Sequence, residues 1–313
     1  MDPRIELDAV GGARDAFGER VRKRLRCATA AAVLLLAAVY AAFVLTGTGQ
    51  RWENAALAGR HLDESLAAAH DASRLLDHIT VSSLAAAVLV LAAIGLLRRR
   101  YALTAAAVGT VCGSLLAAEI LKRYVLPRPD LVDAPDGLTH NSFPSGHTTI
   151  AMSVMFGLIL VVPYRLRGLA AGICYLWAAF VGAYTVAAGW HRPSDMLGAD
   201  LLVLAVVCGL TAALARTGRV RRAGGRRFPL RALLVVLPLT FFALTGLVTG
   251  TILLLDSMFR LDARDPAVPR LAYESGHALA AGAGAAVTLL LLALLRHVDL
   301  DGPGPRRSRG RVL

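Results

Sequence analysis

Charged side chains are scarce in this chain, and acidic ones are scarcer than basic ones. Asp, Glu, Lys and Arg make up 18% of the 313 residues, whereas 56% are hydrophobic, and the mean hydropathy is +0.57. A soluble domain of this length needs a larger share of polar residues to cover its surface. The composition therefore excludes a single soluble domain and predicts a membrane protein.

Cysteine is also rare. The four cysteines lie within or at the edge of apolar segments, at Cys27, Cys112, Cys174 and Cys208. This placement implies no disulfide framework, so we interpret them as small packing residues. The first apolar segment is long for a secretory signal and is not followed by a small-residue cleavage site, so we expect it to remain as a span.

Long apolar segments recur along the chain. Windows of roughly 17 to 24 apolar residues, enough to cross a hydrocarbon core of about 30 Å as a helix, occur eight times. They cover residues 27–49, 79–97, 102–121, 147–162, 169–188, 196–215, 232–255 and 277–295. We therefore expect an all-α, polytopic membrane helix bundle of about eight transmembrane helices.

Basic residues are concentrated on one side of this predicted topology. With the N-terminus in the cytoplasm, 24 of the 34 Lys and Arg residues fall in cytoplasmic segments. The net charge of +12 thus follows the positive-inside rule, and we expect a multi-pass protein of the plasma membrane with both termini cytoplasmic. We interpret the arginine-rich tail as an anchor near anionic membrane lipids and expect no nucleic-acid partner. The richness in Ala, Arg and Gly favours a bacterial source.

These patterns divide the chain into segments. They are a basic cytoplasmic N-terminal segment (1–26), a six-span core (27–215) with an outer segment (50–78), a basic cytoplasmic loop (216–231), two additional C-terminal spans (232–295) and a basic cytoplasmic tail (296–313). The outer segment is rich in Ala and Leu with scattered charges, so we expect a helix that lies on the surface or partly covers the outer face.

Three polar clusters fall on the outer side of this topology. "LKRYVLPRPD" (121–130) ends the third span, "FPSGH" (143–147) opens the fourth, and "GWHRPSD" (189–195) lies between the fifth and sixth. His147 and His191 are 44 residues apart, which allows one span down, a tight turn and one span back. The two histidines are therefore predicted to meet.

Each cluster also has a purely structural interpretation. Lys122 and Arg128 could reach toward lipid headgroups, as basic residues at span ends commonly do. Ser145 could simply cap the fourth span. His191 and Asp195 lie four residues apart and could form an ion pair on one helix face. The coincidence of all three clusters at one level of the membrane favours a functional site.

The residue types in these clusters are suited to phosphoryl transfer. Cations and aimed backbone N–H groups stabilise charge on phosphate oxygens. Ser145 and Gly146 stand at a helix N-terminus, which attracts anions, and Gly146 has no side chain to keep a phosphate away. His191, oriented by Asp195, could attack phosphorus, and His147 could protonate the leaving group.

At these residues the sequence resembles the type 2 phosphatidic acid phosphatase superfamily, integral membrane lipid phosphatases that share a helical core with vanadium haloperoxidases. Its motifs are a lysine followed by Arg-Pro, then Pro-Ser-Gly-His, then Ser-Arg followed by a histidine and, four residues later, an aspartate. The matching residues are Pro144, Ser145, Gly146 and His147 for the second motif and His191 and Asp195 for the third. The resemblance covers about residues 102–215, and the first two spans complete the six-helix core.

The resemblance implies a role for each matching residue. His191 would form a phosphohistidine intermediate with help from Asp195, and His147 would protonate the leaving group. The phosphate would be bound by Lys122, Arg128, Ser145 and Gly146, with neither a metal nor another cofactor.

The sequence departs from the family pattern in two places. Five residues rather than six separate Lys122 from Arg128, and Tyr184 and Thr185 stand where the third motif has Ser-Arg. Threonine supplies no guanidinium, so one phosphate-binding charge is missing. Arg192 or Arg123 is a candidate replacement.

We therefore expect a membrane phosphatase that acts on a lipid phosphate or diphosphate, of the phosphatidate, phosphatidylglycerophosphate or polyprenyl diphosphate class. Its partners would be this substrate and the surrounding membrane lipids, and its site would face outward. One alternative is a lipid phosphotransferase of the same fold, and another is a non-catalytic lipid-binding or transport protein. A third is a metal-dependent hydrolase built from outer-side residues, namely Asp130, Asp133, Asp136, His140, His147 and His191.

Overall fold

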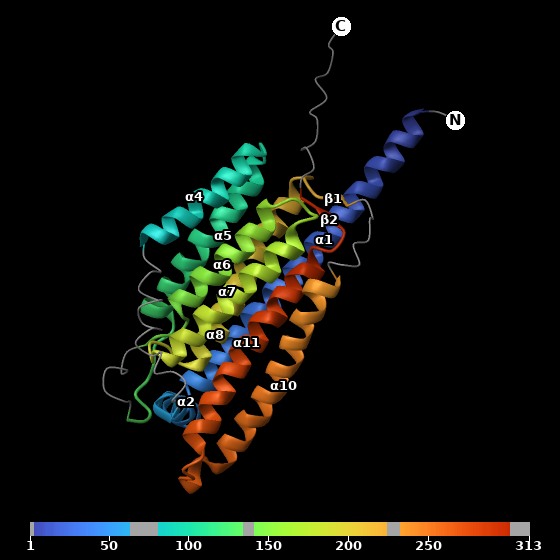
Figure 1. Cartoon of the computed structure of the whole chain (residues 1–313). Helices are drawn as coiled ribbons and strands as arrows, with labels where there is room; N and C mark the ends of the chain where they lie inside the picture. The colour runs from blue at the N-terminus through green and yellow to red at the C-terminus, as the bar shows by residue number, and fades with distance from the viewer. Residues whose placement is uncertain (1–2, 63–80, 134–140, 224–231, 301–313) are drawn as a thin grey trace.

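The computed structural model describes residues 3–62, 81–133, 141–223 and 232–300. Within these ranges the chain forms nine α-helices and one two-stranded sheet. The long helices lie side by side in a single bundle (Figure 1). This architecture confirms the all-α membrane bundle predicted from the sequence.

The elements follow one another as a series of long helices with short connections. The α-helices are α1 (Pro3–Val39), α2 (Gly47–Gly59), α4 (Val81–Leu97), α5 (Tyr101–Ile120), α6 (Gly146–Val161), α7 (Arg167–Ala187), α8 (Pro193–Arg216), α10 (Leu237–Arg260) and α11 (Val268–Leu294). Shorter π-helical or 3-10 turns are Tyr40–Val44, Arg60–Leu62, Leu121–Val125, Ala232–Val236 and Leu261–Ala263. The strands are β1 (Arg221–Arg222) and β2 (Val298–Asp299), which pair antiparallel.

Within the described residues, each of the eight apolar segments expected to span the membrane is mainly helical. Six helices are long and apolar enough to cross a bilayer, within Ala16–Val44, Tyr101–Val125, Arg167–Ala187, Pro193–Arg216, Leu233–Ala263 and Val268–Leu294. The other two, α4 and α6, are apolar helices of 17 and 16 residues. A helix of this length is roughly 24 Å long, which is close to the hydrocarbon thickness.

Several helix boundaries differ from those expected, and local residues explain two of these differences. The first span ends at Val44 rather than at residue 49, because Thr46 has an extended backbone and its hydroxyl accepts the Gly49 N–H at 3.0 Å, which starts α2. The last helix begins at Val268 rather than at residue 277, with Pro269 in its first turn. Proline is favoured there because its missing N–H has no helical partner at that position.

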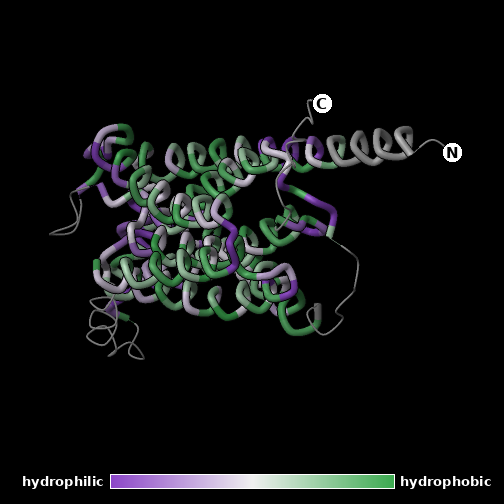
Figure 2. Tube along the Cα trace, turned by 90° about the horizontal axis from the view of Figure 1, so that it is seen from above, coloured by the Kyte–Doolittle hydropathy of each residue, from purple (hydrophilic) through white to green (hydrophobic). Residues whose placement is uncertain are grey.

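The outer surface of the bundle is apolar. Large hydrophobic side chains are exposed along several helices, among them Leu34 of α1, Leu89 of α4, Ile173 of α7 and Leu244 of α10. Figure 2 shows hydrophobic residues along the helices and hydrophilic residues mainly in their connections. Such an extensive apolar surface fits contact with lipid rather than with water.

The last two helices pack closely against each other and extend the bundle. A Cβ atom added to Gly246 of α10 would lie 2.8 Å from the Cα of Gly282 on α11. Glycines at such crossings let helix backbones approach, which stabilises helix pairs in lipid. α11 also packs against α7, α8 and α2.

The residues expected to form the site lie at one end of the bundle. α6 and α8 begin at this end, and α2 lies across it (Figure 1). The start of α1 and the β1–β2 pair lie at the opposite end. Parts of the outer segment (63–78), the basic loop (224–231) and the tail (301–313) lie outside the described residues.

Candidate active site

The two histidines lie close together, as their spacing predicts. Their ring centroids are 6.1 Å apart with the rings nearly edge to face, and His147 is also 5.3 Å from the ring of Trp190. His147 is in the first turn of α6, and His191 lies two residues before α8. Two antiparallel spans, α6 and α7, thus bring them to the same end of the bundle.

The start of α8 orients His191. The Oδ2 atom of Asp195 lies 3.1 Å from the Nδ1 atom of His191 and accepts the Arg192 N–H at 2.9 Å. Asp195 is fully buried. Pro193 begins the helix and fixes its backbone in a helical conformation. One carboxylate therefore caps α8 and holds the imidazole, which leaves Nε2 as the ring nitrogen for chemistry.

Ser145 caps the start of α6. Its hydroxyl accepts the Thr148 N–H at 3.3 Å, so Ser145 is the N-cap of the helix. Its own N–H donates to the Asp195 carbonyl at 2.9 Å, which links the second motif to the third. Of the two amides expected to face an anion, the one at Ser145 is therefore engaged. The space beside Gly146 is open, since a Cβ atom added there would meet nothing within 4 Å.

Asn141 joins the first motif to the second. Its Nδ2 donates to the carbonyls of Lys122 at 3.1 Å and Leu126 at 2.6 Å, and its Oδ1 accepts the Phe143 N–H at 3.1 Å. The Phe143 ring is fully buried. It lies directly on the backbone of α8, where a Cβ atom added to Gly198 would be 2.4 Å from its Cζ.

Because of this contact, we expect Gly198→Ala to destabilise the protein by about 1–3 kcal/mol, the usual cost of overpacking a closed site. Gly209→Ala on the same helix is the matched control, because its nearest neighbour would be Thr29 Oγ1 at 4.0 Å. Thermal unfolding of both variants in detergent measures the difference. Equal unfolding temperatures would contradict the tight packing of Phe143 against α8.

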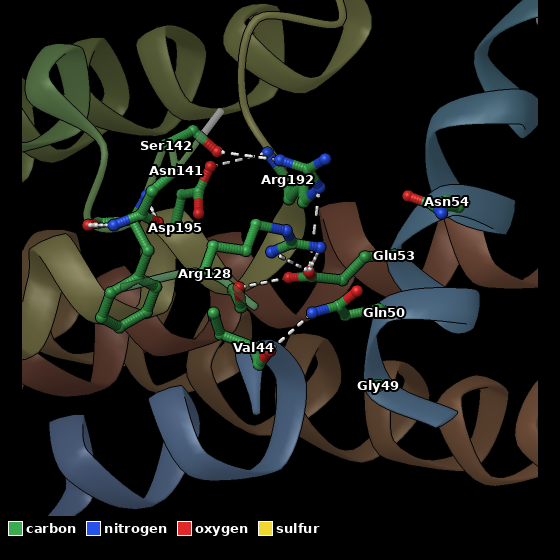
Figure 3. Close-up of polar contacts among 12 residues, drawn as sticks. Val44, Gly49, Gln50, Glu53, Asn54, Arg128, Asn141, Ser142, Arg192 and Asp195 are labelled. Atoms are coloured by element: carbon green, nitrogen blue, oxygen red, sulfur yellow. Dashed lines mark hydrogen bonds and ion pairs between the residues drawn. The ribbon is translucent and has the colours of Figure 1, made fainter. Parts of the chain in front are cut away.

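The cations expected to bind phosphate form two separate groups. Lys122 Nζ lies 3.6 Å from Glu119 Oε1, and Arg123 Nε lies 2.8 Å from Glu119 Oε2. The side chain of Arg123 is 67% exposed. The side chains of Arg128 and Arg192 are instead buried, and both approach Glu53 of α2 (Figure 3).

Glu53 is the centre of this buried charge cluster. Its Oε2 accepts from both terminal nitrogens of Arg128 at 3.1 Å and lies 3.9 Å from Arg192 Nε, while its Oε1 accepts from the Ser194 hydroxyl. Arg192 also donates to the Ser142 hydroxyl at 3.2 Å. Burial, reinforced by the negative charge of Asp195, raises the pKa of Glu53 to about 7.

Thr185 supports the third motif through its backbone. Its side chain is buried and donates to the Gly182 carbonyl at 2.8 Å, and its carbonyl accepts the N–H groups of Trp190 at 3.0 Å and His191 at 3.3 Å. Position 185 therefore presents no charge to the site. Gly189 has a φ of +71°, and an added Cβ atom would lie 1.5 Å from Arg60 Nη1, so the Arg60 guanidinium packs directly on this loop.

Sequence reasoning missed several polar residues at this end. Glu53 and Gln50 come from α2, and Gln50 donates to the carbonyls of Val44 at 2.8 Å and Pro129 at 2.7 Å (Figure 3). Asn141 and Ser142 precede the second cluster, and Ser194 lies within the third. Their roles depend on contacts with distant segments, and no local pattern identifies them.

Among the described residues, no group of three or more His, Cys, Asp and Glu side chains is arranged to hold a metal ion. Two residues of the metal-dependent alternative, Asp136 and His140, lie outside the described residues.

Comparison with known proteins gives a family match for part of the chain. Residues 100–221 match the family model described as the PAP2 superfamily. No curated protein matches the chain, and no solved structure matches it. The matched region contains all three motifs, whereas α1, α2, α4, α10 and α11 lie outside it. Over residues 100–221 the chain is therefore similar to the PAP2 superfamily, and this match together with the apolar helices supports a membrane phosphatase-like protein.

Proposed function

We propose that this protein is an integral membrane phosphatase that hydrolyses a lipid phosphate or diphosphate through a phosphohistidine intermediate. The observation that carries the proposal is the position of His191, whose Nδ1 lies 3.1 Å from Asp195 while its ring is 6.1 Å from that of His147. A nucleophile, its orienting carboxylate and a proton donor thus converge at one end of an apolar bundle.

In the first step, Nε2 of His191 attacks phosphorus, and the bond to the leaving oxygen breaks. His147 gives its proton to that oxygen, so the leaving group departs as an alcohol or a monophosphate. Asp195 stabilises the positive charge that develops on the His191 ring. In the second step, water attacks the phosphohistidine, His147 takes up the proton of the water, and the P–N electron pair returns to His191.

The phosphate would rest beside the first turn of α6. Open space at Gly146 and the helix N-terminus favour an anion there. Lys122 and Arg128 of the first cluster and Arg192 of the third are the cations nearest this position, with Arg123 farther out. The start of α1 and strand β2 lie at the opposite end of the bundle from the starts of α6 and α8, where His147 and His191 occur (Figure 1). This arrangement supports an outward-facing site with cytoplasmic termini in the plasma membrane.

The proposal is tested by phosphate release from a panel of lipid phosphates and diphosphates by the purified protein, with and without EDTA. We expect release from at least one lipid class and no loss of rate with the chelator, because the proposed nucleophile and acid are both histidines. Inhibition by EDTA that zinc or magnesium reverses would favour the metal-dependent alternative. Transfer of phosphate to an added alcohol without net release would favour a phosphotransferase, and binding without turnover would favour a lipid-binding protein.

A further inference from the structure

We propose that, when no substrate is bound, the Glu53 carboxylate occupies the N–H groups of Arg128 and Arg192 that bind the substrate phosphate. Binding of an anion there is then coupled to the uptake of one proton by the Glu53 carboxyl group. This inference rests on the proposed function, because it concerns how the same site accepts its phosphate. It assigns a role to α2, which lies outside the region that matches the family model.

The geometry of Glu53 resembles that of a bound phosphate oxygen. Both terminal nitrogens of Arg128 donate to its Oε2 at 3.1 Å, and Arg192 Nε approaches the same oxygen at 3.9 Å (Figure 3). A guanidinium uses this same fork of N–H groups to bind phosphate. The carboxylate and a phosphate therefore compete for the same donors.

The balance of buried charges indicates that Glu53 becomes neutral when an anion binds. Arg128 and Arg192 are buried, and so are the two carboxylates of Glu53 and Asp195, so the two positive and two negative charges balance. A phosphate dianion added to this cluster would leave buried negative charge uncompensated, which is costly. Neutralising Glu53 removes part of that cost, whereas Asp195 must stay ionised to hold His191.

The groups that face Glu53 make it the carboxyl group that takes up the proton. Arg128 and Arg192 favour its ionised form, while burial and Asp195 oppose it, and the outcome is a pKa of about 7. The Ser194 hydroxyl also bonds to it. α11, which packs along α2, carries four titratable residues in its first half, namely Arg270, Tyr273, Glu274 and His277. Arg270 and Glu274 pair with each other at the surface.

The alternative role for Glu53 is a permanent support for Arg128, and it predicts the opposite result. If Glu53 only held Arg128 in place, then removal of its charge would loosen the arginine and weaken anion binding at every pH. If Glu53 competes with the anion, the same change strengthens binding, and it does so most at high pH, where the carboxylate is ionised. Whether anion affinity rises or falls when the Glu53 charge is removed therefore distinguishes the two roles.

The experiment measures sulfate binding to the purified full-length protein by titration calorimetry between pH 6 and pH 9. Sulfate is the probe because its charge stays constant in this range, unlike that of phosphate. For the unmodified protein we expect the affinity for sulfate to decrease above pH 7, with a limiting slope of about tenfold per pH unit. In Glu53→Gln this fall should disappear, and at pH 8.5 binding should be at least about tenfold tighter than in the unmodified protein.

Glu274→Gln is the matched control, because Glu274 is an exposed carboxylate on α11 that pairs with Arg270 at 2.8 Å. It should bind sulfate as the unmodified protein does. Weaker binding by Glu53→Gln, or an unchanged pH dependence, would overturn the inference.

A second measurement does not depend on any variant. Repeating the titration at pH 8 in buffers of different ionisation enthalpy gives the number of protons taken up, which we expect to be close to one. No proton uptake would overturn the inference even if Glu53→Gln failed to fold. Sulfate binding requires no turnover, so the proposed catalysis can fail while the coupling holds. Conversely, lipid phosphate hydrolysis without proton-coupled sulfate binding would overturn the coupling and leave the function standing.

Discussion

Replacement of His191 with alanine is expected to lower phosphate release from lipid phosphates by about 10⁴-fold or more. Removal of a nucleophile typically leaves only the acceleration that binding and electrostatic stabilisation supply. In this protein His191 is the residue whose Nδ1 is held by a buried carboxylate, Asp195, at 3.1 Å. Its loss would remove the only acceptor proposed for the phosphoryl group.

Two further variants make this result specific. His147→Ala should lose most activity on lipid phosphates. With nitrophenyl phosphate, whose leaving group needs no proton, it should still release about one equivalent of nitrophenol in the first turnover, because only the second step then requires His147, whereas His191→Ala should release none. His297→Asn is the control, because His297 is exposed near β2 at the opposite end of the bundle and asparagine tolerates its φ of 59°. Hydrolysis by His191→Ala at an unchanged rate would rule out the phosphohistidine mechanism.

The helical architecture and the meeting of the histidines could be predicted because both follow from short-range patterns. Apolar segments of membrane-crossing length form helices, since lipid leaves no other partner for backbone polar groups. One span down and one span back then return the chain to the same end. This topology places His147 near His191, whatever the details of side-chain packing.

Local sequence also indicated how α6 begins, and the start of α8 follows the same rules. Ser145 caps α6, and Pro193 with Asp195 starts α8. The sequence left two roles open for Ser145, a cap and an anion-binding amide. A tertiary contact determines the role of the amide, because the Ser145 N–H donates to the Asp195 carbonyl and is therefore already engaged. This bond joins residues 50 positions apart, so no local pattern could reveal it.

Glu53 could not be predicted for the same reason. It lies in the stretch "RWENAALAG", where a single acidic residue is typical of a solvated helix. Its burial depends on Arg128, 75 residues away, and Ser194, 141 residues away. The position of the Lys122 side chain could not be predicted either, because it depends on a π-helical turn at Leu121–Val125. Polar contacts between distant segments therefore decide the site, whereas the apolar pattern decides the bundle.

The buried pair itself leads to a large expected effect on stability. Arg128→Ala would leave the Glu53 carboxylate buried without its principal partner, and breaking such a pair costs about 3–5 kcal/mol. Arg123→Ala is the control, because the Arg123 side chain is 67% exposed and exposed pairs contribute roughly 0–1 kcal/mol. Unfolding in detergent at pH 8 should therefore separate the two variants clearly.

The pH dependence and a rescue variant identify the cause of this loss. The pKa of Glu53 in the folded protein, about 7, exceeds its ordinary value of 4.5, so the folded state holds this proton more tightly than the unfolded chain does. Its stabilising contribution is complete below about pH 4.5 and is lost as the pH rises to about 7. Without Arg128 the pKa rises further, so Arg128→Ala should be more damaging at pH 8 than at pH 6. Glu53→Gln combined with Arg128→Ala should recover much of the loss at pH 8, because the double variant buries no unpaired charge. Equal losses for the single and double variants would show that Arg128 stabilises the fold through packing rather than through its charge.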